Sequence, residues 1–192
     1  MVLLLQTAAQ FGDSFRVAGC LIFSLSMLAV YVASTLSHSF PQNERKMHFF
    51  RRLDQAMIYL MVAGTATPLA FEYLNSTGLW IFFALMWILA LTGCMSKLFF
   101  GHRVDAVAIW IYLLLGWMPF MVLPWLVGVV PSGAMWLILL GGIIYTLGAV
   151  FLFLDKQKYY FHTIWHLMVI VGSFCHYLSI FQFVARRVES IV

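Results

Sequence analysis

Long apolar runs separated by short polar segments dominate the pattern of the chain. A helix needs roughly 20 mostly apolar residues to cross a bilayer, and runs this long and uniform favour helices over barrel strands. The pattern predicts spanning helices at 17–38, 53–73, 79–99, 105–125, 133–154 and 160–183. Residues 1–9 are apolar but too few to cross, as expected for the tail of a further, N-terminal span. We therefore expect an all-α integral membrane helix bundle, with six full spans and a truncated first helix, forming a single transmembrane domain over 1–192.

The composition is that of a protein whose solvent is lipid. Hydrophobic residues make up 64% of the 192 residues and charged residues only 9%, whereas soluble domains carry about 25% charged residues. The net charge of +4 is a weak argument for nucleic-acid binding, because the basic residues lie in short segments between apolar runs. That placement indicates membrane topology, so membrane lipids are the expected partners and nucleic acid is not.

The basic residues fall mostly on one side of the predicted bundle. Eight of the eleven Lys and Arg residues lie in the segments 39–52, 97–105 and 155–159, namely Arg45, Lys46, Arg51, Arg52, Lys97, Arg103, Lys156 and Lys158. The alternate segments, 74–78 and 126–132, contain neither Lys nor Arg. Since basic loops of multi-pass proteins stay in the cytoplasm, this side is expected to be cytoplasmic.

Four ionisable residues lie within the predicted spans at that same side. His38 ends the first full span, and Asp54 begins the second. His162 and His166 begin the last span. Ionisable groups inside a membrane are costly and mark functional sites by default, so three helices are expected to bring polar side chains to one depth. Glu72, near the opposite side, is expected to be exposed.

The local spacing of these residues suits a metal site. His162 and His166 form H-x3-H, and residues four apart share one face of a helix. Two such imidazoles with His38 from a facing helix give three nitrogen ligands and leave a fourth position open, as in catalytic zinc sites. Asp54 is then the expected general base for a water molecule. The Ser34 hydroxyl, one turn from His38, would orient that water or a substrate carbonyl.

Other interpretations of the same residues stay open at this point. The H-x3-H pair can be a helix-packing feature, and Asp54 can cap its helix or pair with Arg51. A bis-histidine haem would use His38 and His162 from facing helices, but it leaves His166 and Asp54 without a role. A proton-coupled transporter would spread its ionisable groups through the membrane, whereas here they cluster at one end.

A further histidine, His176, lies deeper in the last predicted span. It follows His166 by ten residues, or about 15 Å along a helix axis, so it cannot ligate the same ion. We interpret it first as a buried, hydrogen-bonded histidine and second as a residue that lines a pocket. The three cysteines lie in apolar runs without metal-type spacing, as is typical of packing residues; they are Cys20, Cys94 and Cys175.

Three polar stretches together resemble the hemolysin III family, the bacterial branch of the progestin and adipoQ receptor family that includes the adiponectin receptors. The stretches are Ser34–His38, Arg52–Pro68 and His162–Tyr177, with further matches at Gly116-Trp117 and Gly141–Gly148. The resemblance covers most of the chain, from about 19 to 180. It implies a seven-helix bundle with the N-terminus inside and the C-terminus outside, in agreement with the charge distribution.

The resemblance also implies a site and its chemistry. A zinc ion near the cytoplasmic face would be held by histidines that match His38, His162 and His166, with the family's aspartate and serine matched by Asp54 and Ser34. Receptor relatives and the alkaline ceramidases are held to hydrolyse lipid amides at such sites, and the hemolysin name reflects a proposed cytolytic activity. The chain departs from the family in lacking an N-terminal polar segment and most of the first span.

Two functions follow from these expectations. The first is a zinc-dependent hydrolase of lipid amides or esters, with a lipid-like substrate, in the plasma membrane (the inner membrane of a bacterium). The second is a non-enzymatic, membrane-perturbing or sensor protein in which zinc is structural. A haem-binding electron-transfer protein is a third and weaker interpretation.

Overall fold

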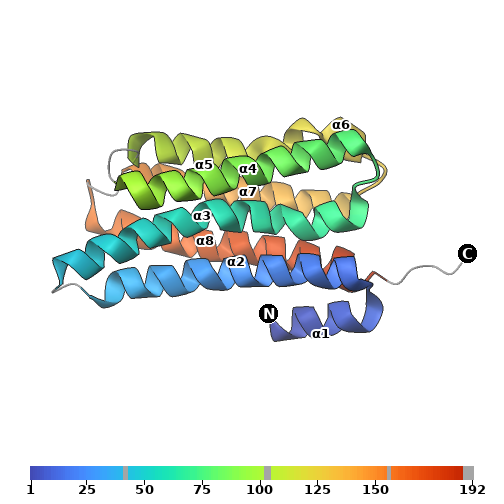
Figure 1. Ribbon diagram of the computed structural model, residues 1–192, viewed down its shortest axis with the longest axis horizontal. Helices are drawn as coiled ribbons and strands as arrows, with labels where there is room; N and C mark the ends of the chain where they lie inside the picture. The colour runs from blue at the N-terminus through green and yellow to red at the C-terminus, as the bar shows by residue number, and fades with distance from the viewer. Residues whose placement is uncertain (41–42, 102–104, 155–156, 188–192) are drawn as a thin grey trace, which may run out of the picture.

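The computed structural model describes residues 1–40, 43–101, 105–154 and 157–187, and over these residues the chain is almost entirely helical (Figure 1). The helices are α1 (Val2–Phe11), α2 (Ser14–Ser39), α3 (Glu44–Tyr73), α4 (Thr77–Phe100), α5 (Asp105–Met121), α6 (Leu123–Leu126), α7 (Ser132–Phe153), α8 (Tyr159–Ile180) and the π-helical turn η2 (Phe181–Ala185). These residues include no β-strand beyond an isolated bridge between Val127 and Val130. The prediction of an all-α fold is confirmed.

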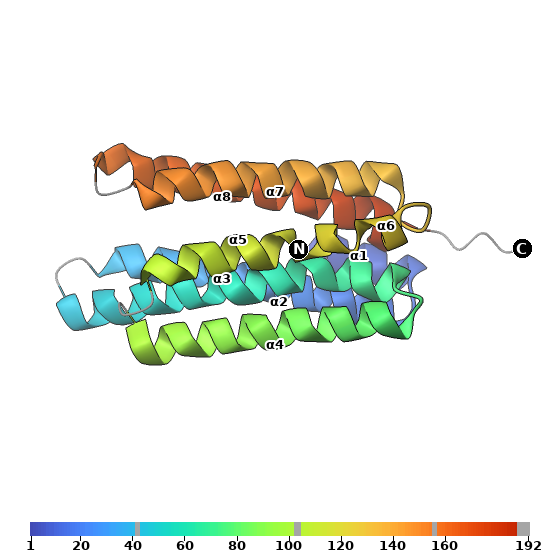
Figure 2. The same ribbon diagram turned by 90° about the horizontal axis from the view of Figure 1, so that it is seen from above.

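Long helices lie side by side along one axis, while α1 covers only part of the length of its neighbour α2 (Figure 1, Figure 2). In the described part of the chain, four segments are long and apolar enough to cross a membrane: Ser14–Ser39, Thr77–Phe100, Ser132–Phe153 and Tyr160–Ala185. Helix α5 has 17 residues, and the 30-residue α3 begins with a charged segment. The bundle is that of a multi-pass membrane protein, and the count of six full spans with a first-helix remnant stays a prediction.

The structure corrects the predicted start of the second span. Most of the segment 39–52, predicted as a loop, belongs to α3, which begins at Glu44. Asn43 caps this helix by accepting a hydrogen bond from the Lys46 backbone N–H, and an acidic residue in the first turn suits the helix dipole. Asp54 therefore lies almost three turns inside the helix, which excludes the interpretation that it is a helix cap.

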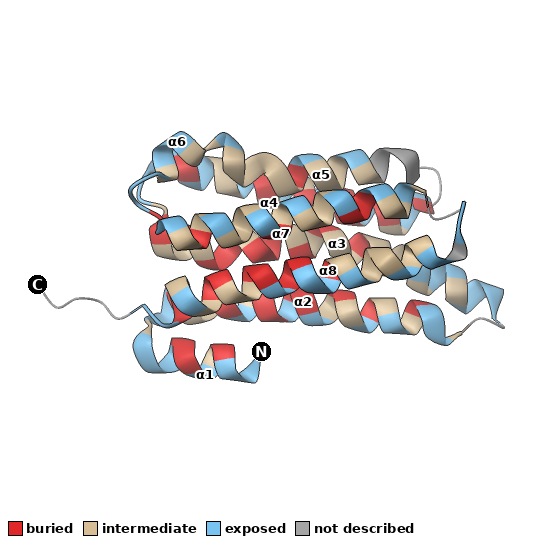
Figure 3. Ribbon diagram, turned by 180° about the vertical axis from the view of Figure 1, so that it is seen from behind, coloured by how far each residue is buried: buried red, intermediate tan, exposed pale blue. Residues whose placement is uncertain are grey.

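The outward faces of the helices are apolar and exposed, as expected for a surface in contact with lipid (Figure 3). Large side chains such as Ile88, Trp110, Trp136 and Phe174 are between 57% and 70% exposed. In water an apolar surface of this extent would cause aggregation. The exposure pattern therefore agrees with the membrane location that the hydropathy predicts.

Small residues allow α7 and α8 to approach closely. Gly141 of α7 lies against the His176 ring and the Gly172 carbonyl of α8, and Gly172 lies against Tyr145 of α7. A Cβ atom at either glycine would overlap its neighbours. The close pairing of these two helices thus depends on glycine, as is common in membrane helix bundles.

A cavity lies between two layers of the bundle. The most extensive backbone contacts are those of α2 with α3, α3 with α4 and α7 with α8. The contacts of α3 or α5 with the α7–α8 pair are far less extensive. In Figure 2 this pair forms a layer of its own. The cavity measures about 810 Å³ and extends from His162 and Asp54 at one end to Tyr73 and Val130 at the other.

An ion-pair cluster joins the helices at the other end of the bundle. Arg16, only 3% exposed, places its Nε 2.9 Å from Glu72 Oε2 and its Nη2 3.1 Å from Oε1. Arg187 Nη1 donates to the same carboxylate at 3.0 Å. Arg16 Nη1 also donates to the carbonyls of Phe11 and Arg187, both at 2.7 Å. Glu72 is an ion-pair partner with a largely buried side chain, so the expectation that it is exposed is wrong.

Candidate metal centre

The three histidines singled out in the sequence meet at one end of the bundle. His38 lies in the last turn of α2, and His162 and His166 lie in the first two turns of α8. His166 Nε2 is 3.0 Å from His162 Nε2 and 3.3 Å from His38 Nε2. One nitrogen from each ring lies within 4.8 Å of the other two. Two helices far apart in the sequence thus bring three imidazole nitrogens to one point.

The three rings meet through their edges and do not stack. Their planes are inclined by 64–83° and their centroids are 4.6–5.4 Å apart. The Nε2–Nε2 distances of 3.0 and 3.3 Å show that the nitrogen-bearing edges of the rings meet at the common point. His166 Nε2 lies 3.0 Å from His162 Nε2 and 3.3 Å from His38 Nε2, so a third imidazole stands where a porphyrin between His38 and His162 would lie, which disfavours the bis-histidine haem interpretation.

This set of ligand atoms fits a zinc ion. With Zn–N distances of about 2.0–2.1 Å in tetrahedral coordination, ligand nitrogens lie roughly 3.3 Å apart, close to the 3.0 and 3.3 Å separations of the Nε2 atoms. A neutral imidazole has one N–H and one acceptor nitrogen. Three Nε2 atoms that face one another therefore cannot all be satisfied by mutual hydrogen bonds, whereas a shared cation satisfies all three lone pairs.

Asp54 and Ser34 share the cavity with this centre. Both line it together with His162 and His166. The Asp54 carboxylate of α3 lies near the Ser34 and Ser37 side chains of α2, and the Ser37 hydroxyl donates to the Ser34 carbonyl at 2.8 Å. No ion pair between Asp54 and its neighbour in sequence, Arg51, occurs among the described contacts. The expected aspartate and serine are thus brought together, and the structure adds Ser37, which the sequence pattern did not single out.

The three-histidine group is open to the outside at the rim of the bundle. His38 is exposed, and His162 and His166 are half-buried. Lys97, where the predicted span 79–99 overlaps the basic segment 97–105, lies in the last turns of α4, where it is 1% exposed and lines the cavity. The hydropathy pattern could not reveal this position, because a lysine close to the end of an apolar run usually reaches the solvent.

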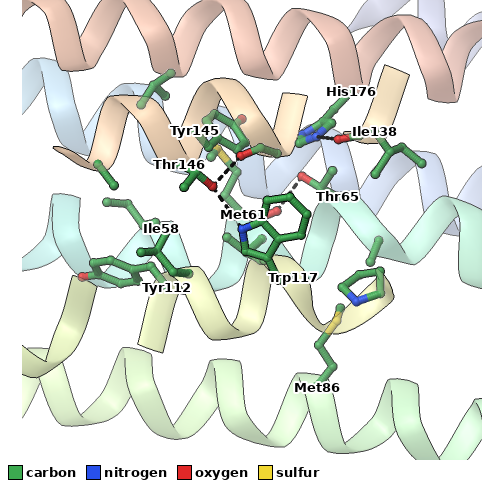
Figure 4. Close-up of a pocket in the computed structure, with 18 of the residues that line it drawn as sticks. Ile58, Met61, Thr65, Met86, Tyr112, Trp117, Ile138, Tyr145, Thr146 and His176 are labelled. Carbon is green, nitrogen blue, oxygen red and sulfur yellow. Dashed lines mark hydrogen bonds between the residues drawn. The ribbon is translucent and has the colours of Figure 1, made fainter. Parts of the chain in front are cut away.

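His176 lies away from the metal centre, as predicted. It is buried, and its Nε2 lies 3.3 Å from the Ile138 carbonyl (Figure 4). Its Nδ1 has no hydrogen-bond partner. The interpretation of His176 as a buried, hydrogen-bonded histidine is confirmed. Trp117, Tyr145 and Thr146 line the cavity near it. No sequence signal distinguishes these three residues, because such residues are common in apolar helices.

Fold and site together define a class: multi-pass helical membrane proteins with a three-histidine group at one end of the bundle. Within this class, the chain belongs to the Haemolysin-III related family, whose model matches residues 1–177. The family resemblance inferred from the three polar stretches is therefore confirmed.

Curated relatives extend from bacteria to mammals. The chain is 33% identical to the hemolysin-3 homolog of Bacillus subtilis over 173 residues, which are 90% of this chain and 80% of that protein. It is also 33% identical to hemolysin-3 of Bacillus cereus over 175 residues, 90% of this chain and 78% of that protein. Human monocyte to macrophage differentiation factor is 25% identical over 173 residues, 86% of this chain and 70% of that protein. No solved structure matches the chain significantly.

Proposed function

We propose that this protein is a zinc-dependent hydrolase of lipid amides or esters that acts near the cytoplasmic face of the plasma membrane. The observation that carries the proposal is the convergence of three histidine Nε2 atoms, 3.0 and 3.3 Å apart, at one end of a cavity of about 810 Å³. Two of these histidines, His162 and His166, line the cavity. A molecule inside the cavity therefore has direct access to the ion that they would hold.

The three histidines, Asp54 and the neighbouring serines each have a role in the proposal. His38, His162 and His166 hold the zinc ion, which when bound polarises a substrate carbonyl and lowers the pKa of a water molecule toward about 7. Asp54 accepts a proton from the attacking water as general base and returns it to the leaving nitrogen or oxygen. Ser34 orients the Asp54 carboxylate by its hydroxyl group, while the Ser37 hydroxyl donates to the Ser34 carbonyl at 2.8 Å. The products are a carboxylic acid and an amine or alcohol.

The rest of the cavity suits the apolar part of a lipid. Its wall beyond the metal end is formed mostly by aliphatic and aromatic side chains, such as Ile58, Val62, Leu69, Phe83 and Met86. Ligand pockets usually measure about 300–1,000 Å³, and this cavity lies in the upper part of that range. Because the cavity lies between membrane-spanning layers, a lipid in the bilayer is the substrate with the shortest route to it.

The charge distribution supports the cytoplasmic placement of the site. The basic residues Arg45, Lys46, Arg51 and Arg52 lie in the first turns of α3, at the same end of the bundle as the histidines (Figure 1). Positive segments of multi-pass proteins face the cytoplasm. In a bacterium with two membranes, the site would lie at the inner face of the inner membrane.

Metal content and hydrolysis, measured on one purified full-length preparation, test the proposal. We expect about one zinc per chain and release of fatty acid from an N-acyl ethanolamine or a ceramide. Asp54→Asn keeps the size of the side chain and loses the base, so it should retain zinc and lower the rate by about 10²–10⁴-fold. Wild-type protein without zinc, or full activity in Asp54→Asn, would overturn the mechanism.

The relatives named hemolysin-3 favour a second candidate, a membrane-perturbing or sensing protein in which zinc is structural. The same preparation separates the two functions. Zinc-containing protein that hydrolyses no member of a lipid panel, but releases a dye trapped in vesicles, would support the second candidate. Hydrolysis without dye release would support the first.

A further inference from the structure

A belt of polar side chains crosses the cavity away from the metal centre (Figure 4). Its members, which all line the cavity and which we name the mid-cavity belt, are Thr65, Trp117, Tyr145, Thr146 and His176. Two positions on α8 locate the belt relative to His166. Gly172, which lies against Tyr145, comes six residues after His166, and His176 comes ten residues after His166. The belt therefore lies about 9–15 Å from the metal centre along the helix axis.

The hydrogens of the belt are already donated to acceptors within the protein. Thr65 Oγ1 donates to the Met61 carbonyl at 2.7 Å. Thr146 Oγ1 donates to the Gly142 carbonyl at 2.8 Å and accepts from Trp117 Nε1 at 3.0 Å. A hydroxyl has one hydrogen and two acceptor lone pairs. Both threonine oxygens thus keep the capacity to accept a further hydrogen bond, while neither has a hydrogen left to donate.

The partners of the other two residues fix the directions of their hydrogen bonds. Ser173 Oγ donates to the Val169 carbonyl at 2.7 Å, so the Tyr145 hydroxyl, 2.8 Å away, must donate to Ser173. The Ile138 carbonyl can only accept, so His176 Nε2 carries the hydrogen of their 3.3 Å contact. Nδ1 of the neutral ring is then an acceptor without a partner. Because Nδ1 is covered by protein atoms, a ligand reaches it after a rotation of the ring.

The belt therefore offers acceptors to the cavity and withholds donors. We propose that it is a specificity subsite for a lipid chain that carries a hydroxyl group about 9–15 Å from the carbonyl at the metal centre. A plain hydrocarbon chain leaves the belt acceptors unpaired, and a ketone adds another acceptor, so both are disfavoured. Tyr31, on the facing α2, also lines the cavity and adds a hydroxyl that can both donate and accept. The inference rests on the proposed lipid occupancy of the cavity but not on hydrolysis.

Three ethanolamides that differ at a single carbon test the subsite. Ricinoleoyl ethanolamide carries a mid-chain hydroxyl, oleoyl ethanolamide lacks it, and the ketone formed by oxidising that hydroxyl can only accept. Their affinities are measured by displacement of radiolabelled oleoyl ethanolamide from zinc-containing, full-length protein in detergent, so no turnover is needed. The hydroxyl compound should bind about three- to tenfold tighter than oleoyl ethanolamide, the difference typical of one hydrogen bond, and the ketone should bind less tightly than the hydroxyl compound.

Two threonines provide a matched pair of variants. Thr146 and Thr67 each accept a hydrogen bond from an indole N–H, Thr146 from Trp117 at 3.0 Å and Thr67 from Trp87 at 3.2 Å. Thr146 lines the cavity, whereas Thr67 is buried outside its wall. Thr146→Val removes an acceptor and frees the Trp117 N–H as a donor, so the ketone should gain affinity and the preference for the hydroxyl over the ketone should disappear. Thr67→Val should keep the wild-type ratio of affinities.

Each outcome decides a separate point. Equal binding of the three compounds to wild-type protein, or the same change in Thr67→Val as in Thr146→Val, overturns the subsite and leaves the lipid cavity intact. If none of the three binds, the proposed lipid occupancy fails as well. Should Thr146→Val not fold, Tyr145→Phe, which keeps the ring and loses the acceptor oxygen, must lower the hydroxyl preference, and an unchanged preference there also overturns the subsite.

Discussion

His166 Nε2 lies 3.3 Å from His38 Nε2, although 128 residues separate the two histidines in the sequence. An ion shared by these nitrogens would link the C-terminal end of α2 to the N-terminal end of α8. A ligand that binds only the folded state stabilises that state. The metal content of this protein should therefore be coupled to the stability of its bundle.

His166→Ala is expected to lower the affinity for zinc by more than about 100-fold, because loss of groups that merely orient metal ligands already costs 10–100-fold. His166 is the suitable position, since its Nε2 contacts those of both His162 and His38. Competition with a chromogenic chelator measures the affinity. His48→Ala, which removes a histidine of α3 outside the three-histidine group, is the control and should bind zinc as the wild type does. Unchanged affinity in His166→Ala would contradict the centre.

Removal of zinc is expected to lower the midpoint of thermal unfolding of the wild-type protein. A ligand at 1,000 times its Kd stabilises the folded state by about 4 kcal/mol. Added zinc should restore the midpoint, whereas magnesium, which prefers oxygen ligands, should not. Loss of helical circular dichroism on heating in detergent measures the effect. His166→Ala should show little response to the chelator, and an equal response would mean that the chelator acts elsewhere.

The three-histidine group could be predicted from the sequence because its geometry is mostly local. His162 and His166 are one helical turn apart, so any helix places them on one face. The depth of His38 follows from the length of the span that it ends. The helical bundle was predictable for the same reason, since the apolar runs of the sequence already have the length of a membrane crossing.

Contacts that depend on the rotation of one helix against another could not be predicted. The Arg16–Glu72 ion pair joins residues 56 positions apart, and nothing in their own segments indicates that they meet. Lys97 is buried although it lies close to the end of its helix, and the apolar run alone does not show which way its side chain points. Of the mid-cavity belt only His176 was singled out; Tyr145 and Thr146 were missed because α7 is apolar all around, so its pattern does not show which face borders the cavity.

Glu72→Gln is expected to destabilise the folded protein by about 3–5 kcal/mol, because the buried Arg16 keeps its charge and loses its carboxylate partner. Arg187 contacts the same carboxylate at 3.0 Å, but its side chain is 45% exposed. Arg187→Ala should therefore cost no more than about 1 kcal/mol. Thermal unfolding of both variants in one detergent gives the comparison. Equal losses would show that burial of the Arg16 pair is not the source of the effect.

Two neighbouring glycines of α7 test the close pairing of this helix with α8. A Cβ atom on Gly141 would overlap the His176 ring, whereas nothing lies within 4 Å of a Cβ atom on Gly142. Gly141→Ala is expected to cost about 1–3 kcal/mol through overpacking. Gly142→Ala should be neutral or stabilising by up to about 1 kcal/mol, because alanine favours helix. Both substitutions change helix propensity equally, so the difference between their unfolding midpoints reports the packing of α7 on α8, and equal midpoints would contradict that packing.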